Sequence, residues 1–129
     1  ADYGWLEESQ EDPHPDGTEA PIATWTPHTS VNGMTTRPAN LPGGEHTVYA
    51  TVFGSWATIF PKGHQILKID FTETDDGWVG DVEVFASDVG TPLPITGGPD
   101  GNLYYATFDH GGAIHVISPQ NFEGDFDWI

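Results

Sequence analysis

The chain contains no cysteine, so it can form neither a disulfide framework nor a thiolate metal site. It has no hydrophobic run long enough to span a membrane as a helix. Apolar residues do not recur with a helical period over any sustained stretch, so we expect helices to be scarce. The sequence starts at Ala1 without a hydrophobic leader, which we interpret as a processed or excised product.

Positive charge is scarce. Twenty acidic residues face only Arg37, Lys62 and Lys68, which gives a formal net charge of −17. Such a surface repels nucleic acid and anionic membranes, so we expect neither as a partner. It also repels itself, and salt relieves that repulsion because the Debye length falls to about 3 Å at 1 M. We therefore predict an extracellular protein of a high-salt environment, with an ordinary acidic secreted protein as the alternative.

Glycine and proline are abundant. Sixteen glycines and eleven prolines in 129 residues indicate many turns, while a hydrophobic content of 36% is enough for one folded domain with a core. We predict an all-β fold. Its clearest unit is a hairpin of Leu103–Phe108 and Ala113–Ile117, with turns at Pro99–Gly101 and Asp109–Gly112.

The strands of this hairpin have counterparts earlier in the chain. Val48–Phe53 resembles Tyr104–Phe108, and Gln65–Ile69 resembles Gly112–Val116. A repeat of this size, with several short strands in each copy, is typical of the antiparallel four-stranded blades of a β-propeller. A two-sheet sandwich is the alternative.

The expected organisation has three parts. Residues 1–20 form an acidic arm, residues 21–120 hold about two blades, and residues 121–129 form an aromatic and acidic tail that packs on another part of the structure. Further expected strands are Ala20–Trp25, Ser30–Arg37, His46–Phe53, His64–Phe71 and Asp81–Ala86, with a turn at Thr74–Gly77. Propellers close with about four to eight blades, so this chain is an incomplete propeller by itself.

Four separated motifs resemble the C-terminal part of the soluble quinoprotein glucose/sorbosone dehydrogenases. They are Tyr3-Gly4-Trp5, Thr26–Met34 with its Pro-His and Gly-Met pairs, Gly54-Ser55-Trp56 followed by Pro61-Lys62-Gly63, and Gly98–Tyr104 with its Gly-Pro-Asp-Gly-x-Leu-Tyr turn. The resemblance implies a six-bladed propeller that binds pyrroloquinoline quinone (PQQ) and oxidises a sugar. It also implies that the catalytic histidine and the calcium site lie in earlier blades that this chain does not contain.

The chain departs from the family at its cationic positions. Thr58 stands where the family has an arginine after its Gly-Ser-Trp-Asn loop, and Thr91 or Leu93 where an arginine precedes the last turn. A quinone with three carboxylates is held best by fixed cationic donors. The resemblance therefore implies the fold more strongly than the chemistry.

The resemblance places four candidate residues at the cofactor rim: Trp25, His28, Ser55 and Trp56. An indole can stack on a planar cofactor, and an imidazole can donate to its carboxylates. The alternatives are that Trp25 belongs to the core, that His28 is an ordinary loop residue, and that Trp56 packs over the central channel. We assign no catalytic residue.

Metal chemistry has weak support. No pair of histidines has ligand spacing on one element, His14 lies between prolines, His110 lies in a turn, and His115 alternates with apolar residues on a strand. Asp75-Asp76-Gly77, Asp12 and Asp16 offer oxygen atoms of the kind that calcium prefers, although a solvated acidic turn is the simpler interpretation.

Two hypotheses of different classes follow. The first is the C-terminal portion of a secreted PQQ-dependent sugar dehydrogenase-like propeller, an oxidoreductase only once upstream blades complete it. The second is a non-catalytic β module that closes with copies of itself or with a partner chain, because open sheets leave strand edges unsatisfied.

The charge imbalance predicts stabilisation by salt. Raising NaCl from about 0.05 to about 1 M should move the urea unfolding midpoint upward, because screening weakens carboxylate repulsion more in the compact state. The gain should shrink at about pH 3, where most carboxylates are neutral. An unchanged or lower midpoint at about pH 7 would contradict the prediction.

Overall fold

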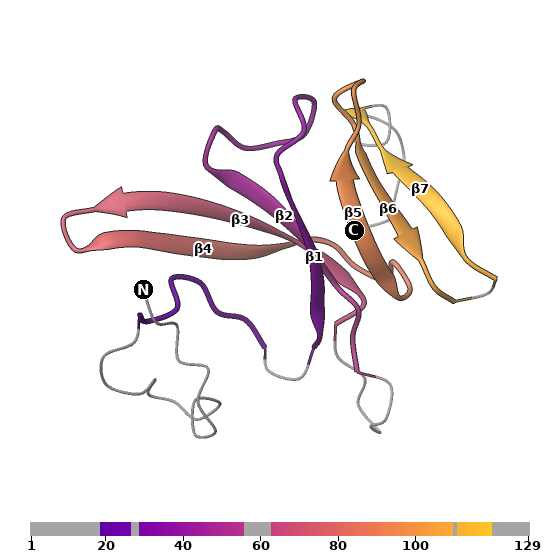
Figure 1. Ribbon diagram of the computed structural model, residues 1–129, viewed down its shortest axis with the longest axis horizontal. Helices are drawn as coiled ribbons and strands as arrows, with labels where there is room; N and C mark the ends of the chain where they lie inside the picture. The colour runs from indigo at the N-terminus through magenta and orange to yellow at the C-terminus, as the bar shows by residue number, and fades with distance from the viewer. Residues whose placement is uncertain (1–18, 27–28, 56–62, 110, 120–129) are drawn as a thin grey trace.

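The computed structural model describes residues 19–26, 29–55, 63–109 and 111–119 (Figure 1). Its elements are seven strands in two antiparallel sheets, with spatial orders β1-β2-β3-β4 and β5-β6-β7. The strands are β1 (Val31–Thr36), β2 (Thr47–Val52), β3 (Gln65–Thr74), β4 (Gly77–Ala86), β5 (Pro92–Gly97), β6 (Leu103–Thr107) and β7 (Ala113–Ile117). The all-β prediction is confirmed, while the tail 121–129, His110 and most of the predicted acidic arm lie outside the described residues.

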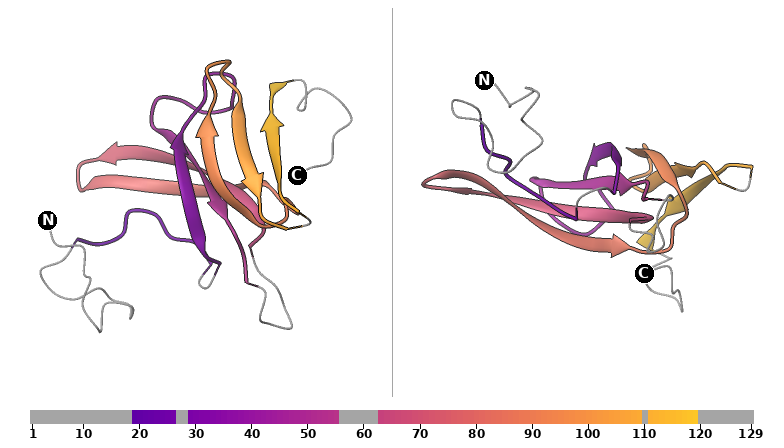
Figure 2. Two further views of the ribbon diagram at one scale, coloured as in Figure 1. Left: turned by 45° about the vertical axis from the view of Figure 1, so that its right-hand side comes forward. Right: turned by 90° about the horizontal axis from the view of Figure 1, so that it is seen from below.

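The two sheets form an unclosed pair of blades. The first is a complete four-stranded blade and the second has three strands among the described residues, as the sequence predicted. The inner strands β1 and β5 lie side by side, and the other strands splay away from them in both directions (Figures 1 and 2).

The β3–β4 hairpin is longer than predicted. Both strands have ten residues, and they run up to the expected turn at Asp75 and Asp76, where Gly77 has a φ of 111°. The sequence prediction ended at Phe71 because the last residues of β3 are polar and exposed, so they carry no core-facing pattern. Backbone pairing extends the hairpin beyond the core, together with an edge-on contact between His46 and Trp78.

The predicted strand Ala20–Trp25 is wrong. This segment has no strand assignment and makes one backbone hydrogen bond with β4, in which the Gly80 amide donates to the Ile22 carbonyl at 2.6 Å. Pro21 has no amide proton for a ladder, which limits pairing here. The segment instead crosses the outer face of the first blade, where Ala23 packs on the cluster of Ala50, Val52, Leu67 and Ile69.

The main core lies between the two blades. It is formed by buried side chains from both sheets and the loops beside them: Leu41, Tyr49, Ile66, Ala86, Leu103 and Ile117. Tyr49 is fully buried, packs edge-on against Phe85, and donates its hydroxyl proton to the Pro42 carbonyl at 2.6 Å. Burial, followed by the charge of Asp70, raises the pKa of Tyr49. The hydroxyl therefore remains a neutral donor inside the core.

A close backbone approach joins the inner strands. The Thr51 hydroxyl of the first blade donates to the Leu93 carbonyl of the second at 2.6 Å. A Cβ atom on Gly33 would lie 2.6 Å from that same carbonyl, a distance that real Cβ atoms do not reach. Glycine at position 33 lets β1 and β5 approach closely enough for this bond.

The repeat is preserved in strand pairing but not in the direction of its side chains. Lys68 pairs with Tyr49 in the first blade, and His115 pairs with Tyr105 in the second, as the aligned sequences require. Both tyrosines nevertheless contact the same core between the blades, so they face each other. Equivalent positions of successive propeller blades point the same way round the axis. Side chains alternate along a strand, so positions that are structurally equivalent in the two blades are shifted by one residue from positions that the sequence repeat aligns.

Leu103 tests the importance of the inter-blade core. Leu103→Ala should lower the free energy of unfolding by about 2 to 5 kcal/mol, because it removes a side chain with 0% exposure from the centre of that core. The matched control is Val79→Ala on β4, which is 51% exposed and should change stability by less than about 0.5 kcal/mol. Urea unfolding at high salt measures both. Equal losses in the two variants would contradict this assignment of the core.

Candidate functional site

The candidate site lies where β1 begins and β2 ends. The backbone ladder continues past both strands there: the Phe53 amide donates to the Ser30 carbonyl, and the Gly54 amide to the Thr29 carbonyl, both at 2.8 Å. These bonds join the segment that follows Trp25 to the segment that leads into Ser55. Trp25 and Ser55, two of the four residues predicted from the sequence, thus belong to segments that meet at one end of the first blade. The other two, His28 and Trp56, lie outside the described residues.

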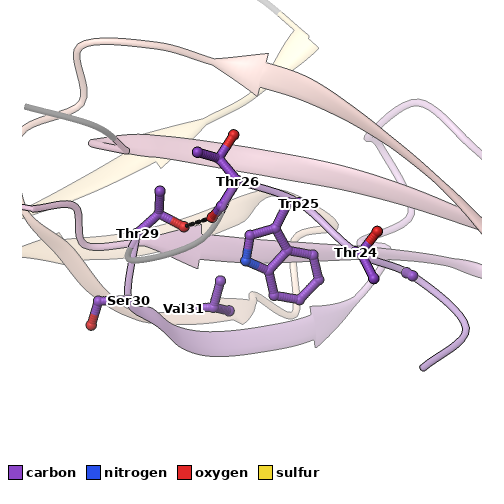
Figure 3. Close-up of a pocket in the computed structure, with 7 residues that line it drawn as sticks. Thr24, Trp25, Thr26, Thr29, Ser30 and Val31 are labelled. Carbon is purple, nitrogen blue, oxygen red and sulfur yellow. Dashed lines mark hydrogen bonds between the residues drawn. The ribbon is translucent and has the colours of Figure 1, made fainter. Parts of the chain in front are cut away.

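Trp25 borders a shallow hollow of about 300 Å³. Hydroxyl side chains surround it, and the Thr29 hydroxyl donates to the Thr26 carbonyl at 2.9 Å (Figure 3). The indole is turned toward Val31 and stays 40% exposed within this chain. A partly exposed indole beside several hydroxyl groups can stack on a flat ligand and hydrogen-bond its edge.

A second hollow of about 200 Å³ lies between this segment and the first blade. Residues 24–26 form one wall, and the strands contribute an apolar floor that includes Val52, Leu67 and Val82. Residues 24–26 therefore cover part of the outer face of the first blade, and Trp25 borders the space that remains.

Two glycines fix the loop that carries Ser55. Gly54 and Gly63 both have positive φ values, 104° and 86°. A Cβ atom on Gly63 would lie 2.5 Å from the Gly54 Cα atom, so the two ends of the loop pack backbone against backbone. Ser55, the first residue inside this closure, is half-buried. The position of Ser55 thus depends on a contact that larger residues would prevent.

His64 is a residue of this region that the sequence did not single out. It follows Gly63, has a φ of 58°, and places its Nδ1 atom 2.9 Å from the Gly90 carbonyl. Its own carbonyl accepts a hydrogen bond from the Val89 amide at 3.2 Å. His64 therefore ties the base of the loop to the connection between the blades. No sequence pattern predicts a histidine with a positive φ, so the neighbouring Gly63 was the only signal for it in the sequence.

Both described cations are engaged away from the site. Arg37 follows β1 at its opposite end, where its guanidinium donates to the carbonyls of Gly44 and Leu41, among others. Lys68 contacts Asp70 at 2.5 Å and Glu83 at 3.1 Å. The hydrogen bond between Lys68 and Asp70 raises the pKa of the lysine and lowers that of the carboxyl group.

Two positions at which the resembled glucose/sorbosone dehydrogenases have an arginine, Thr91 and Leu93, lie among the described residues. The Thr91 hydroxyl donates to Asp109 Oδ1 at 2.8 Å, and the Leu93 carbonyl accepts the inter-blade bond from Thr51. Thr58 and Lys62 lie outside the described residues. The described part of the site offers an indole and hydroxyl groups but no cation, so these residues alone do not fit a quinone with three carboxylates.

The described ranges contain no cluster of three histidine or acidic side chains that could hold a metal ion. The same part of the chain contains no helix that is both long and apolar enough for a membrane span. The Asp75–Asp76 turn, named above for calcium, is exposed, and the described residues bring no third ligand of this kind to either carboxylate.

The chain is similar in structure to the holo form of the pyranose dehydrogenase PQQ domain from Coprinopsis cinerea. The TM-score is 0.54 and the identity 19%, over 78% of this chain and 29% of that chain. At this identity the likeness concerns the fold: two blades of the kind found in a PQQ domain, without pointing to the glucose/sorbosone dehydrogenases in particular. No protein-family model and no curated protein matches the sequence.

Gly63→Ala tests the closure of the loop base. The variant should lose more stability than Gly77→Ala, because Gly77, with a φ of 111°, has open space where a Cβ atom would lie. Both substitutions cost backbone strain of about 1 kcal/mol, but only Gly63→Ala forces a backbone clash as well. Urea unfolding of the two variants measures the difference. Equal midpoints would show that the contact between Gly54 and Gly63 is unimportant.

Proposed function

We propose that this chain is the two-blade C-terminal portion of a PQQ-dependent sugar dehydrogenase-like propeller, supplying blade packing and part of the cofactor rim. The observation that carries the proposal is the unclosed pair of blades with the fold of a PQQ domain, of which it spans 29%. The remaining blades come from another chain or from copies of this one. Sugar oxidation belongs to the completed propeller, because we assign no catalytic base to this portion.

The rim contribution rests on Trp25, His28, Ser55 and Trp56. Two observations support this grouping: the partly exposed indole of Trp25, and the backbone bonds that bring the two segments to one end of the first blade. We assign them stacking and hydrogen bonding to the quinone. We assign the cations that neutralise its carboxylates, and any calcium ion, chiefly to the other blades, because both described cations are committed elsewhere and Lys62 is the one further cation of this chain.

A non-catalytic module that closes by assembly is the second candidate. It is favoured by the lack of a cation among the described residues that line the site. Like the first candidate, it requires cover for the open face of the second blade, where Ile114 is 80% and Val116 47% exposed. An apolar face of this kind is covered when a further blade packs on it. In this reading the chain is an extracellular structural or binding protein, and the PQQ-domain fold is inherited without the chemistry. Both readings place it outside the cell in a high-salt environment.

Two measurements, the native mass and the binding of PQQ, together distinguish the dehydrogenase portion from the non-catalytic module. The native protein should be purified at high salt, its mass measured and every polypeptide in it identified. We expect a larger assembly that changes the visible absorption of PQQ in the presence of calcium. Trp25→Leu should weaken PQQ binding by about tenfold, as the loss of one stacking contact predicts. Trp78→Leu is the matched control, because Trp78 is also 40% exposed but lies near the β3–β4 turn.

Three outcomes would contradict the proposal in whole or in part. An assembly of this chain alone that leaves the PQQ spectrum unchanged favours the non-catalytic module. A stable monomer of 14.0 kDa contradicts both functions, since each requires additional blades. Equal PQQ binding by Trp25→Leu and the unsubstituted protein removes Trp25 from the rim.

A further inference from the structure

A second exposed aromatic side chain, Phe108, lies at the end of the molecule that carries the candidate site. The ladder of the second blade ends as that of the first blade does: the Phe108 amide donates to the Thr91 carbonyl at 3.1 Å, as the Phe53 amide donates to the Ser30 carbonyl. Thr91 directly precedes β5, and Ser30 directly precedes β1. Phe53 and Phe108 therefore hold equivalent positions in two successive blades, at the end where the segment of Trp25 meets the first blade.

The two phenyl rings contact each other across the blades. Their centroids lie 6.2 Å apart at an interplanar angle of 56°, which is within the range of favourable aromatic pairs. Phe53 is half-buried, whereas Phe108 is 63% exposed. A single exposed apolar side chain is common on a protein surface. This ring, however, is held by a second ring and by a backbone hydrogen bond, so it presents a fixed aromatic surface at the rim.

A fixed carboxylate borders this aromatic pair. Asp109 directly follows Phe108, and its Oδ1 atom accepts hydrogen bonds from the Thr91 hydroxyl at 2.8 Å and from the Thr91 amide at 3.2 Å. A Cβ atom on Gly90 would lie 2.9 Å from the same oxygen, closer than real Cβ contacts, so the carboxylate packs directly on the Gly90 backbone. The Gly90 carbonyl in turn contacts His64. The connection between the blades thus fixes the carboxylate next to the exposed ring.

The charge of this part of the rim favours a neutral ligand. Both described cations, Arg37 and Lys68, are engaged elsewhere, and the chain has a formal net charge of −17. A second anion beside the Asp109 carboxylate would be repelled, so the carboxylates of a quinone do not suit this position. A sugar ring is neutral. Its C–H groups can pack on the electron-rich face of a phenyl ring, while its hydroxyl groups donate to acceptors around it.

We propose that Phe108, packed on Phe53, is a sugar-binding platform, and that the Asp109 carboxylate beside it discriminates against anionic ligands. The inference rests on the function proposed above, to which it adds a contact with the substrate. In this arrangement the first blade stacks on the quinone through Trp25, and the second blade binds the sugar through Phe108. Neither ring transfers a proton or a hydride, so the role of both is binding.

Glucose binding tests the platform. The native assembly of the full-length chain is titrated with glucose at high salt, before PQQ is added, and saturation-transfer NMR gives the Kd. Phe108→Leu should raise that Kd by about three- to tenfold, because the variant keeps an apolar side chain but loses the ring face. Phe108→Tyr keeps the ring and should stay within about twofold of the unsubstituted protein. The matched control is Trp78→Leu, which removes an exposed ring near the β3–β4 turn and should leave the Kd unchanged.

Asp109→Asn tests the electrostatic part of the proposal. Asparagine keeps an Oδ1 atom that can accept the two bonds from Thr91, so the variant removes charge with little change of shape. The unsubstituted assembly should bind glucuronate more weakly than glucose. Asp109→Asn should narrow this difference by about two- to fivefold at the lowest salt at which the assembly persists, and by less as salt screens the charge.

The outcomes separate this inference from the proposed function. Glucose binding that is absent in the unsubstituted assembly, unchanged in Phe108→Leu, or equally weakened in Trp78→Leu would overturn the platform. An unchanged preference for glucose over glucuronate in Asp109→Asn would overturn the role of the carboxylate. An assembly that leaves the PQQ spectrum unchanged contradicts the dehydrogenase, whatever its glucose binding. Normal PQQ binding together with no effect of Phe108→Leu on glucose contradicts the platform alone.

Discussion

The packing of the first blade against the second is the contact on which the rest of the structure depends. Tyr49 and Ile66 from one sheet meet Leu103 and Ile117 from the other, and all four are almost fully buried. The close approach at Gly33 and the bond from Thr51 to the Leu93 carbonyl set the distance between the inner strands. Neither sheet can bury both of its faces alone, so each blade is stabilised by packing against the other. The outermost face of each blade has to be covered by further chain or by further blades.

Positive charge is scarce, and both described cations make contacts that stabilise the fold. Arg37 satisfies carbonyl groups of the loop between β1 and β2, and Lys68 neutralises two carboxylates on the outer strands. A desolvated anion costs several kcal/mol unless it is paired, so a carboxylated cofactor needs cations that these two residues do not supply. In the function proposed above, this constraint assigns most of the neutralisation of the cofactor to other blades and leaves stacking and hydrogen bonding to this portion.

The candidate site was predictable in its parts rather than in its arrangement. Trp25 and Ser55 were found through motifs that resemble a known family, and the structure joins their segments through the bonds at Thr29 and Ser30. His64 was missed because its role depends on a left-handed backbone and on Gly90, which lies far from it in the sequence. The predicted strand Ala20–Trp25 failed because an apolar segment that crosses a sheet face has the same composition as one that pairs along an edge.

The sequence by itself determined the fold class, the two blades and the turn at Asp75–Asp76, because alternation and turn residues act locally. The aligned repeat also determined the pairing of β2 with β3 and of β6 with β7. Only the tertiary structure decided which face of each strand is buried. Tyr49 and Tyr105 occupy matching places in the repeat yet face each other, because a shift of one residue reverses every side chain and is settled by packing between the sheets.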